Sequence, residues 1–354
     1  MSSPTGPAPG LPVRMPRPRQ SGRHRRPEPV AAPEGAPALV LAVPGAPTPA
    51  MRSLAEEIIS IARSELPGLE VGIGYLDGVD PQPAAPQPVD AFAEGVDGAG
   101  AAVADANSFD AADGSDGSDG AGAPAVDASA GPSLTSVLAR TAALRTERYE
   151  IALAAGREVP APEGPSAVVV PLLAGPDAAL MARIQQAADA SGATVELAQV
   201  LGPHPLLAEA VHVRLSEAGL ARADRARLFT VATAADGIIL ATVGGDEAVR
   251  AAGITGMLLA ARLAVPVMAA ALDQDGSVAA TAEQLRASGS TQLAVAPYLI
   301  GPELPDGLLE TALKEAGAPA SEALGAYPAI GKLVLSQYTT TLGITPQPQG
   351  SPLR

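Results

Sequence analysis

Two acidic residues occupy corresponding places in the chain, and both have side chains that can do chemistry. Asp177 and Glu303 each follow a proline at the end of an apolar run, in LLAGPD and YLIGPE. Carboxylates in such places can bind a hard divalent cation or accept a proton. They can equally be acids at helix N-termini, where free amide groups and the helix dipole favour negative charge. The sequence leaves both interpretations open.

Small and polar residues that follow other apolar runs predict a ligand pocket. Thr242 precedes Gly244 and Gly245, and amide groups at a turn before a helix can bind phosphate or carboxylate. Neither the P-loop nor the GxGxxG pattern is present, so nucleotide binding is not predicted. The main cations available to an acidic ligand are Arg183, Arg250, Arg262 and Arg286. The pocket candidates, all near predicted strand ends, are Gly45, Ala46, Asp77, Gly175, Thr242, Gly244 and Gly245.

Histidine is scarce, and cysteine is absent. Without cysteine, thiolate metal sites, disulfides and a cysteine nucleophile are excluded. His24 lies in a basic N-terminal stretch. His204, in LGPHP, is predicted to pack or to cap a helix, and His212 to be a semi-buried structural residue. No spacing between a histidine and another ligand indicates a metal site.

The chain contains an internal duplication. VVVPLLAGPD at 168–177 matches AVAPYLIGPE at 294–303, and LGPHPLLAEAVHVRL at 201–215 matches LGAYPAIGKLVLSQY at 324–338. LVLAVPGAP at 39–47 likewise resembles IILATVGGD at 238–246. The separation between copies falls from 199 residues at the first glycine pair to 123 at LG, so the insertions lie in the first copy.

Each copy reads as alternating strands and helices. Continuous apolar strands with short connections predict an α/β fold with two similar domains, each a parallel sheet flanked by helices. Two such domains would face each other across a cleft at the carboxyl ends of their strands. The strands expected in the first copy are 38–43, 70–76, 167–173 and 194–200, and the helices 51–66, 133–145, 177–191 and 206–219. In the second copy the strands are 237–240, 265–272 and 292–300, and the helices 248–263, 278–288, 305–317 and 328–338.

Charge separates the two-copy body from its additions. Residues 1–36, with six arginines and two glutamates, form a predicted disordered basic tail. The insert 78–131 has nine aspartates, one glutamate and no lysine or arginine, and is also predicted to be disordered. The domains are then 37–220 and 224–340, followed by a C-terminal tail at 341–354.

The net charge of -15 also bears on partners. An acidic body is a poor ligand for nucleic acid, because binding phosphates requires clustered lysine and arginine. No run of signal-peptide or membrane-spanning length is found, and cysteine is missing, so we expect a cytoplasmic protein without a membrane partner.

In the order of these motifs the chain resembles the sirohydrochlorin chelatases and the related anaerobic cobalt chelatases of the long, two-copy type. The resemblance covers roughly residues 37–340 without the acidic insert. It implies a strand-end pocket that holds a tetrapyrrole, with Co²⁺ or Fe²⁺ as substrate ion, no permanent cofactor, and a role in cobalamin or siroheme biosynthesis. It also implies one histidine where Pro44 stands and another in the stretch Asp177–Ala179.

Metal insertion needs a base near neutral pH and a transient metal ligand, and histidine supplies both. Two hypotheses follow for the function. The chain is a chelatase (a lyase) that uses carboxylates such as Asp177 and Glu303, or it is a non-catalytic relative that binds a tetrapyrrole or metal and regulates a partner. A two-lobed binding module of another family is disfavoured by the repeat order.

Overall fold

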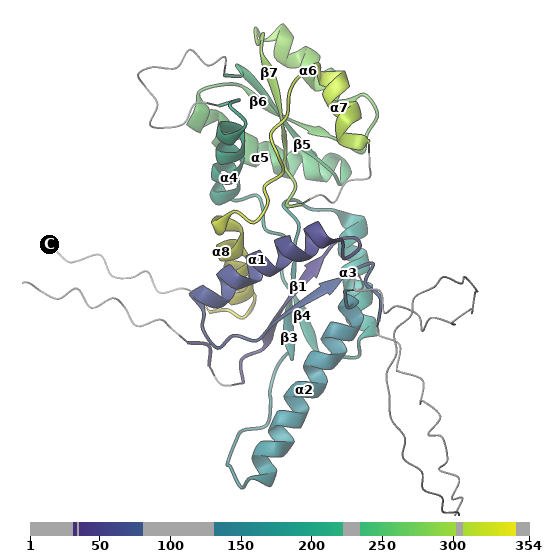
Figure 1. Cartoon of the computed structure of the whole chain (residues 1–354), viewed down its shortest axis with the longest axis vertical. Helices are drawn as coiled ribbons and strands as arrows, with labels where there is room; N and C mark the ends of the chain where they lie inside the picture. Colours follow the sequence, from purple (N-terminus) through teal and green to yellow (C-terminus); the bar gives the residue numbers. More distant parts are fainter. Residues whose placement is uncertain (1–30, 34, 81–130, 222–233, 302–306, 345–354) are drawn as a thin grey trace, which may run out of the picture.

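The fold consists of two lobes, each built on a parallel β-sheet (Figure 1). The computed structural model describes residues 31–33, 35–80, 131–221, 234–301 and 307–344. The basic tail up to residue 30, most of the acidic insert, His24 and Glu303 lie outside the described residues. The strands are β1 (Ala38–Val43), β2 (Val71–Tyr75), β3 (Ala167–Pro171), β4 (Val195–Leu197), β5 (Gly237–Thr242), β6 (Val267–Ala271) and β7 (Leu293–Pro297). The helices are α1 (Pro49–Glu65), α2 (Leu134–Ala154), α3 (Ala178–Ala190), α4 (Pro205–Glu217), α5 (Gly245–Leu263), α6 (Ser277–Ala287), α7 (Leu308–Ala316) and α8 (Pro328–Thr341).

The first lobe contains a four-stranded sheet in the order β2-β1-β3-β4, with all pairs parallel. Every residue of β1 and β3 is buried, which explains their unbroken apolar sequences. Helix α2 crosses β2, where Gly74 leaves room for it: a Cβ there would lie 2.7 Å from the Cα of Leu134. The carboxyl ends of all four strands therefore point to the same edge of the sheet.

The second lobe repeats this plan with three strands, in the order β6-β5-β7. Strands β5 and β7 are buried throughout, as β1 and β3 are. In place of a fourth strand, Ala320 forms a single parallel bridge with Val295. The two parallel sheets flanked by helices confirm the α/β fold predicted from the sequence.

Helix α2 is longer than the predicted 133–145, because it continues to Ala154. No glycine or proline interrupts the chain before Gly156, so the helix extends beyond the part that packs on the sheet. Its last turns expose Ile151 and Leu153. Arg145 ties the helix to the returning chain by donating a hydrogen bond to the carbonyl oxygen of Glu163 (2.9 Å).

The last helix of each copy packs on the other lobe. Helix α4 contacts α5 and β7 of the second lobe, whereas α8 contacts α1 and β3 of the first (Figure 1). The α8–α1 contact is close, since a Cβ added to Gly331 would lie 2.6 Å from the Cβ of Ile61. The domain ranges 37–220 and 224–340 stay a prediction that follows chain order. In the packing, by contrast, α4 of the first copy lies against the second lobe and α8 of the second copy lies against the first.

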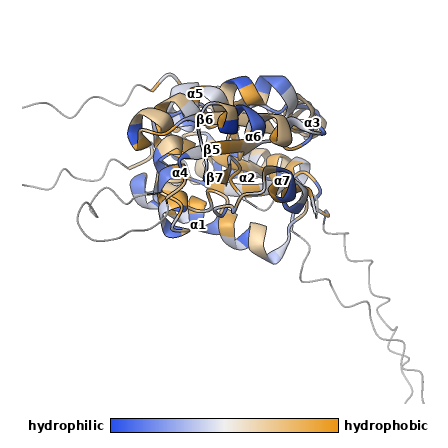
Figure 2. Cartoon of the chain, turned by 90° about the horizontal axis from the view of Figure 1, so that it is seen from above, coloured by the Kyte–Doolittle hydropathy of each residue, from blue (hydrophilic) through white to orange (hydrophobic). Residues whose placement is uncertain are grey.

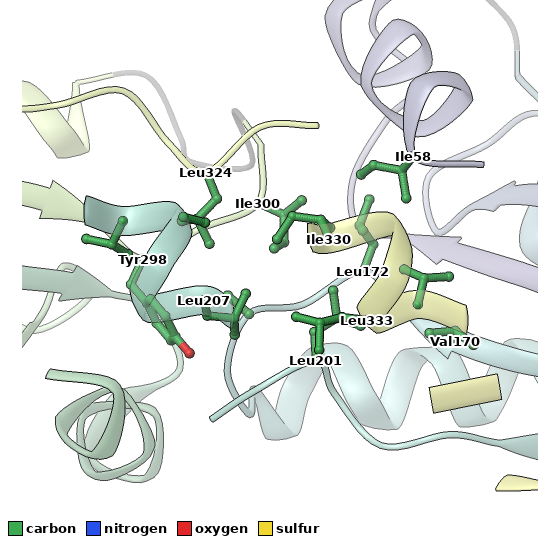
Figure 3. Close-up of a cluster of buried hydrophobic side chains, with 14 of the residues drawn as sticks. Ile58, Val170, Leu172, Leu201, Leu207, Tyr298, Ile300, Leu324, Ile330 and Leu333 are labelled. Atoms are coloured by element: carbon green, nitrogen blue, oxygen red, sulfur yellow. The ribbon is translucent and has the colours of Figure 1, made fainter. Parts of the chain in front are cut away.

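This exchange produces one hydrophobic core that runs through both lobes. The largest cluster of buried side chains joins β1, β3 and α1 to α4, α8, β5 and β7. In Figure 3 it extends from Tyr298 of the second lobe through Leu207 and Ile300 to Val170 of the first. Each fully buried aliphatic side chain contributes about 1.5–3 kcal/mol, so the shared core holds the lobes together.

Helices α1 and α5 occupy equivalent places and bury equivalent residues. The buried residues of α1 are Met51, Ala55, Ile58, Ile59 and Ala62. Adding 197 to each number gives the buried residues of α5, which are Ala248, Ala252, Thr255, Gly256 and Leu259.

The outward faces of these two helices differ. Helix α5 exposes Ile254, Met257 and Leu258, whereas α1 has Glu57 and Ser60 at the first two of these positions. Figure 2 shows hydrophilic and hydrophobic residues mixed over the helices around β5, β6 and β7. No helix among the described residues is long and apolar enough to cross a membrane.

Candidate functional site

A cavity of about 450 Å³ lies between the two lobes, at the carboxyl ends of their central strands. Its volume is within the range of small-molecule sites. The walls come from both copies: Pro44, Leu173 and Gly175 from the first, and Val243, Tyr298 and Leu299 from the second. Most of the lining is apolar, and the charged side chains among the described lining residues are Asp77, Asp177, Arg183 and Asp273.

The first lobe supplies an ion pair at the cavity wall. Asp77 follows β2, and its backbone N–H donates a hydrogen bond to the carbonyl oxygen of Gly45 (3.1 Å), which fixes the end of β2 beside the end of β1. The Asp77 carboxylate accepts a hydrogen bond from Arg183 of α3 (2.5 Å). Both side chains are about half exposed, at 49% and 45%. The pair therefore faces water and the cavity together.

Asp177 begins helix α3. Its Oδ1 accepts a hydrogen bond from the backbone N–H of Leu180 (2.9 Å), which makes it the N-cap of that helix. Of the two interpretations made from the sequence, the capping role is thus observed. The side chain still lines the cavity, close to Ala179. Among the described residues, the helix cap engages Oδ1 alone, and a ligand role for Asp177 is a proposal.

The second lobe has an aspartate at the position equivalent to Asp77. Asp273 follows β6, and its Oδ2 accepts hydrogen bonds from the backbone N–H groups of Gly244 (3.0 Å) and Gly245 (3.2 Å). The anion-binding turn expected from the sequence is therefore occupied by a carboxylate of the chain itself. Gly244 has φ +107°, and a Cβ there would lie 2.5 Å from the carbonyl oxygen of Pro176. The turn after β5 in the second lobe therefore contacts the turn after β3 in the first.

Tyr298 closes the apolar side of the cavity. Its side chain is 1% exposed, and its hydroxyl forms a hydrogen bond of 2.9 Å with Oγ1 of Thr255 in α5. Burial raises the pKa of Tyr298 to about 12, so the phenol stays neutral at physiological pH. The hydroxyl also lies against Gly202, where an added Cβ would be 2.6 Å away.

The two described histidines have structural roles and do not line the cavity. Nδ1 of His204 accepts a hydrogen bond from the backbone N–H of Leu206 (3.1 Å) and caps α4, which confirms the predicted packing or capping role. Burial lowers the pKa of His204. His212 is buried and its Nδ1 accepts a hydrogen bond from Nε of Arg262 (2.8 Å), across the α4–α5 contact. Within the described ranges, no group of three or more acidic or histidine residues is placed to hold a metal ion.

The structure brings most of the predicted site residues together. The lining includes Pro44, Gly45, Asp77, Gly175, Asp177, Ala179 and Thr242. The lining does not include Ala46, Gly244 or Gly245, which follow the lining residues Gly45 and Val243 in the chain. Glu303 falls outside the described residues. Of the four candidate arginines, Arg183 lines the cavity, while Arg262 bonds His212 and Arg286 donates to the carbonyl oxygen of Ala316.

Sequence reasoning missed Asp273 and Tyr298. A signal for Asp273 was available, because Leu76-Asp77 and Leu272-Asp273 end the second strand of each copy. Tyr298 stands where the first copy has Leu172, within the matched segments PLL and PYL. A tyrosine in a continuous apolar run gave no reason to expect a place beside a cavity.

Comparisons with known proteins find structural likeness only. No family model matches the chain, and no curated protein matches its sequence. Two solved structures of SirB, a sirohydrochlorin chelatase, match over 86% of this chain and 95% of their own. The structure from Bacillus subtilis subspecies spizizenii with cobalt has 12% identity and a TM-score of 0.47, and that from Bacillus subtilis with Fe³⁺ has 13% and 0.49.

A third match is DR2241 from Deinococcus radiodurans, a multi-domain protein described as structurally similar to chelatases. It has 15% identity and a TM-score of 0.44, and the match covers 85% of this chain and 55% of that protein. These matches include proteins described as chelatases or as similar to them, the family that the sequence resembles. At these identities the likeness concerns the fold and does not extend to individual site residues.

Proposed function

We propose that the cavity between the lobes binds a tetrapyrrole such as sirohydrochlorin, and that the chain is a non-catalytic relative of the cobalt and iron chelatases. The observation that carries the proposal is a two-lobed, mostly apolar cavity in which Pro44 and the stretch Asp177–Ala179 stand where the family resemblance implies histidines. A flat macrocycle needs apolar walls on both faces, and the two lobes supply one each.

The chemistry of metal insertion supports the non-catalytic version. The reaction removes two pyrrole protons and transfers a divalent ion from water to four nitrogens. Proline offers neither a proton acceptor nor a metal ligand. Each carboxylate in the described lining has an internal partner: Asp77 has Arg183, Asp177 has the Leu180 amide, and Asp273 has the two glycine amides. These contacts compete with use of the carboxylates as a base.

Active insertion is the second candidate, because three carboxylates do face the cavity. In that mechanism Co²⁺ or Fe²⁺ would be the substrate ion. Asp177 and Glu303 would hold it and accept the pyrrole protons. Carboxylate oxygens are hard ligands, which suit these borderline ions less well than imidazole does. We therefore place binding first and insertion second.

One experiment tests both candidates. Purified full-length protein is titrated with sirohydrochlorin under anaerobic conditions, and the absorption and fluorescence of the macrocycle are followed. We expect saturable binding, and after addition of Co²⁺ or Fe²⁺ an insertion rate equal to that without protein.

Failure to bind sirohydrochlorin would overturn the proposal. A protein-dependent rise in the insertion rate would establish the second candidate instead. In that case Asp177→Asn and Glu303→Gln should both reduce the rate, and Glu247→Gln, an exposed acid on α5, serves as the matched control.

A further inference from the structure

We propose that Arg183 is the receptor for a carboxylate of the bound ligand, and that Asp77 occupies this receptor when no ligand is present. The inference rests on the proposed binding of a tetrapyrrole, whose ring carries acidic side chains. It assigns a role in ligand specificity to Arg183, which lies outside the positions where the resemblance implies histidines.

The first step is the charge of the cavity. Among the described lining residues, Arg183 is the one cation, and it is accompanied by Asp77, Asp177 and Asp273. An acidic ligand entering such a cavity is repelled by three carboxylates unless its own carboxylate reaches the guanidinium. Arginine suits this purpose because its planar donors match a carboxylate with two parallel hydrogen bonds.

The second step is that the three aspartates are not equally available. Asp273 is held by two backbone amides and Asp177 by one, and backbone groups at a turn and a helix start cannot move away without unfolding them. Within the described part of the chain, the Asp77 carboxylate is held by the side chain of Arg183 alone. It is therefore the carboxylate that can be exchanged for another.

The third step is the cost of that exchange. The side chains of Asp77 and Arg183 are 49% and 45% exposed, so their ion pair lies in a region of high dielectric. Exposed pairs of this kind contribute little to stability, because water screens both charges. A ligand carboxylate replaces an interaction of similar strength, while water hydrates the released Asp77. Meanwhile the backbone N–H of Asp77 keeps its hydrogen bond to Gly45, so the strand end stays in place.

The test compares two ligands that differ only in charge. The probes are coproporphyrin, a porphyrin with carboxylate side chains, and the same porphyrin with every carboxylate converted to a neutral amide. Both are titrated by fluorescence quenching against the wild type, Arg183→Gln, Asp77→Asn and Arg250→Gln. Arg250 is an exposed arginine of α5 outside the cavity lining, so its variant has the same charge change without the proposed contact.

We expect Arg183→Gln to weaken binding of the acid about two- to fivefold, because an exposed charge pair is lost, and to leave binding of the amide unchanged. Asp77→Asn should strengthen binding of the acid about two- to fivefold, because the competitor is gone. Arg250→Gln should stay within about twofold of the wild type for both probes. In the wild type, salt should weaken binding of the acid more than binding of the amide.

Equal binding of the acid by wild type and Arg183→Gln would overturn the inference while leaving the proposed cavity function intact. If the wild type binds neither porphyrin, this inference is overturned; if it also fails to bind sirohydrochlorin, the proposed function is wrong as well. Should Arg183→Gln not fold, Arg183→Lys answers the same question. That variant keeps the charge but loses the paired donors, so an intermediate loss of affinity for the acid alone is expected.

Discussion

Asp77 and Asp273 occupy the same position in the two copies but have different partners. Each follows the second strand of its sheet and faces the cavity. Asp273 accepts hydrogen bonds from the backbone of Gly244 and Gly245, whereas Asp77 pairs with the side chain of Arg183. The described part of the corresponding helix α7 contains no arginine that could serve Asp273 in the same way.

The difference shows how a duplicated fold can divide its roles. In the second lobe the charge is neutralised by local backbone, which makes that wall of the cavity part of the fold. In the first lobe it is neutralised by a side chain from another helix, which leaves that wall open to a ligand. Substitutions at equivalent or neighbouring positions test this contrast between a structural and an exchangeable wall.

The largest effect is expected at the glycines that follow the first strand of each copy, Gly45 after β1 and Gly244 after β5. Gly244→Ala should lower the free energy of unfolding by about 2–5 kcal/mol, since φ is +107° and the new Cβ would lie 2.5 Å from the carbonyl oxygen of Pro176. Gly45→Ala should cost only about 1–2 kcal/mol, because φ is +78° with nothing within 4 Å. Urea unfolding of both variants measures the difference. Equal losses of unfolding free energy would contradict the difference in space around the two glycines.

The next effect concerns the Tyr298–Thr255 pair, which replaces Leu172 and Ile58 of the first copy. Tyr298→Phe should cost about 1–3 kcal/mol, because Thr255 keeps a buried hydroxyl that has lost this partner. The double variant Tyr298→Phe/Thr255→Val should recover much of the loss, since both polar groups are removed. A double variant no more stable than the single one would contradict this account.

The same tyrosine makes stability depend on alkaline pH. Burial raises the pKa of Tyr298 from an ordinary value of 10.0 to about 12. Its contribution is therefore complete below pH 10 and is lost as the pH rises through 12, because the unfolded chain loses its proton first. The wild type should lose stability in this window more steeply than Tyr298→Phe, as thermal melting at each pH will show. Parallel curves would exclude Tyr298 as the source.

A smaller effect is expected from the two aspartates themselves. Asp273→Ala should cost about 0.5–2 kcal/mol, as the loss of a helix cap does, because the amides at the start of α5 lose their acceptor. Asp77→Ala should cost less than about 1 kcal/mol, the range of exposed ion pairs. Melting temperatures at low and high salt distinguish the two cases, since only the ion pair is screened strongly. A larger loss for Asp77→Ala would reverse the assignment of roles.

The smallest effect is expected on the outward face of α5, where the copies differ in polarity. Ile254→Glu gives the second copy the residue that the first has at Glu57. Because Ile254 is 46% exposed, we expect a change within about 0.5 kcal/mol in unfolding free energy. Leu259→Glu, on the buried face of the same helix, is the control and should prevent stable folding.

The order of strands and helices was predictable from the sequence, because the central strands β1, β3, β5 and β7 are buried throughout and continuously apolar. Strand β1 at Ala38–Val43 coincides with the predicted 38–43. Helix α3 at Ala178–Ala190 lies within the predicted 177–191, and Asp177 is its N-cap. The end of α2 was missed because its last turns pack on little and follow their own helix propensity. The exchange of α4 and α8 was not predicted either, since an apolar stripe shows which face is buried but not which lobe buries it.

The cavity was predicted in place but not in detail. Parallel strands in both copies put Gly45, Asp77 and Thr242 at one edge, and all three residues line the cavity. The partners of the charged residues depend on side chains brought together from distant segments, as with Arg183 and Asp77, which are 106 residues apart. Local patterns carry no information on such pairs, so the choice of Arg183 among four arginines required the structure.

The crossed positions of α4 and α8 limit how the cavity can open. Swinging one lobe away from the other would uncover Leu207 and Val211 on one side and Ile330 and Leu333 on the other, at about 1.5–3 kcal/mol for each side chain. A ligand that gains less than this sum cannot drive such a motion, so entry must rely on side chains at the rim. A chain cut between α4 and β5 would give two fragments that stay associated, and neither would fold into a lobe without the helix supplied by the other.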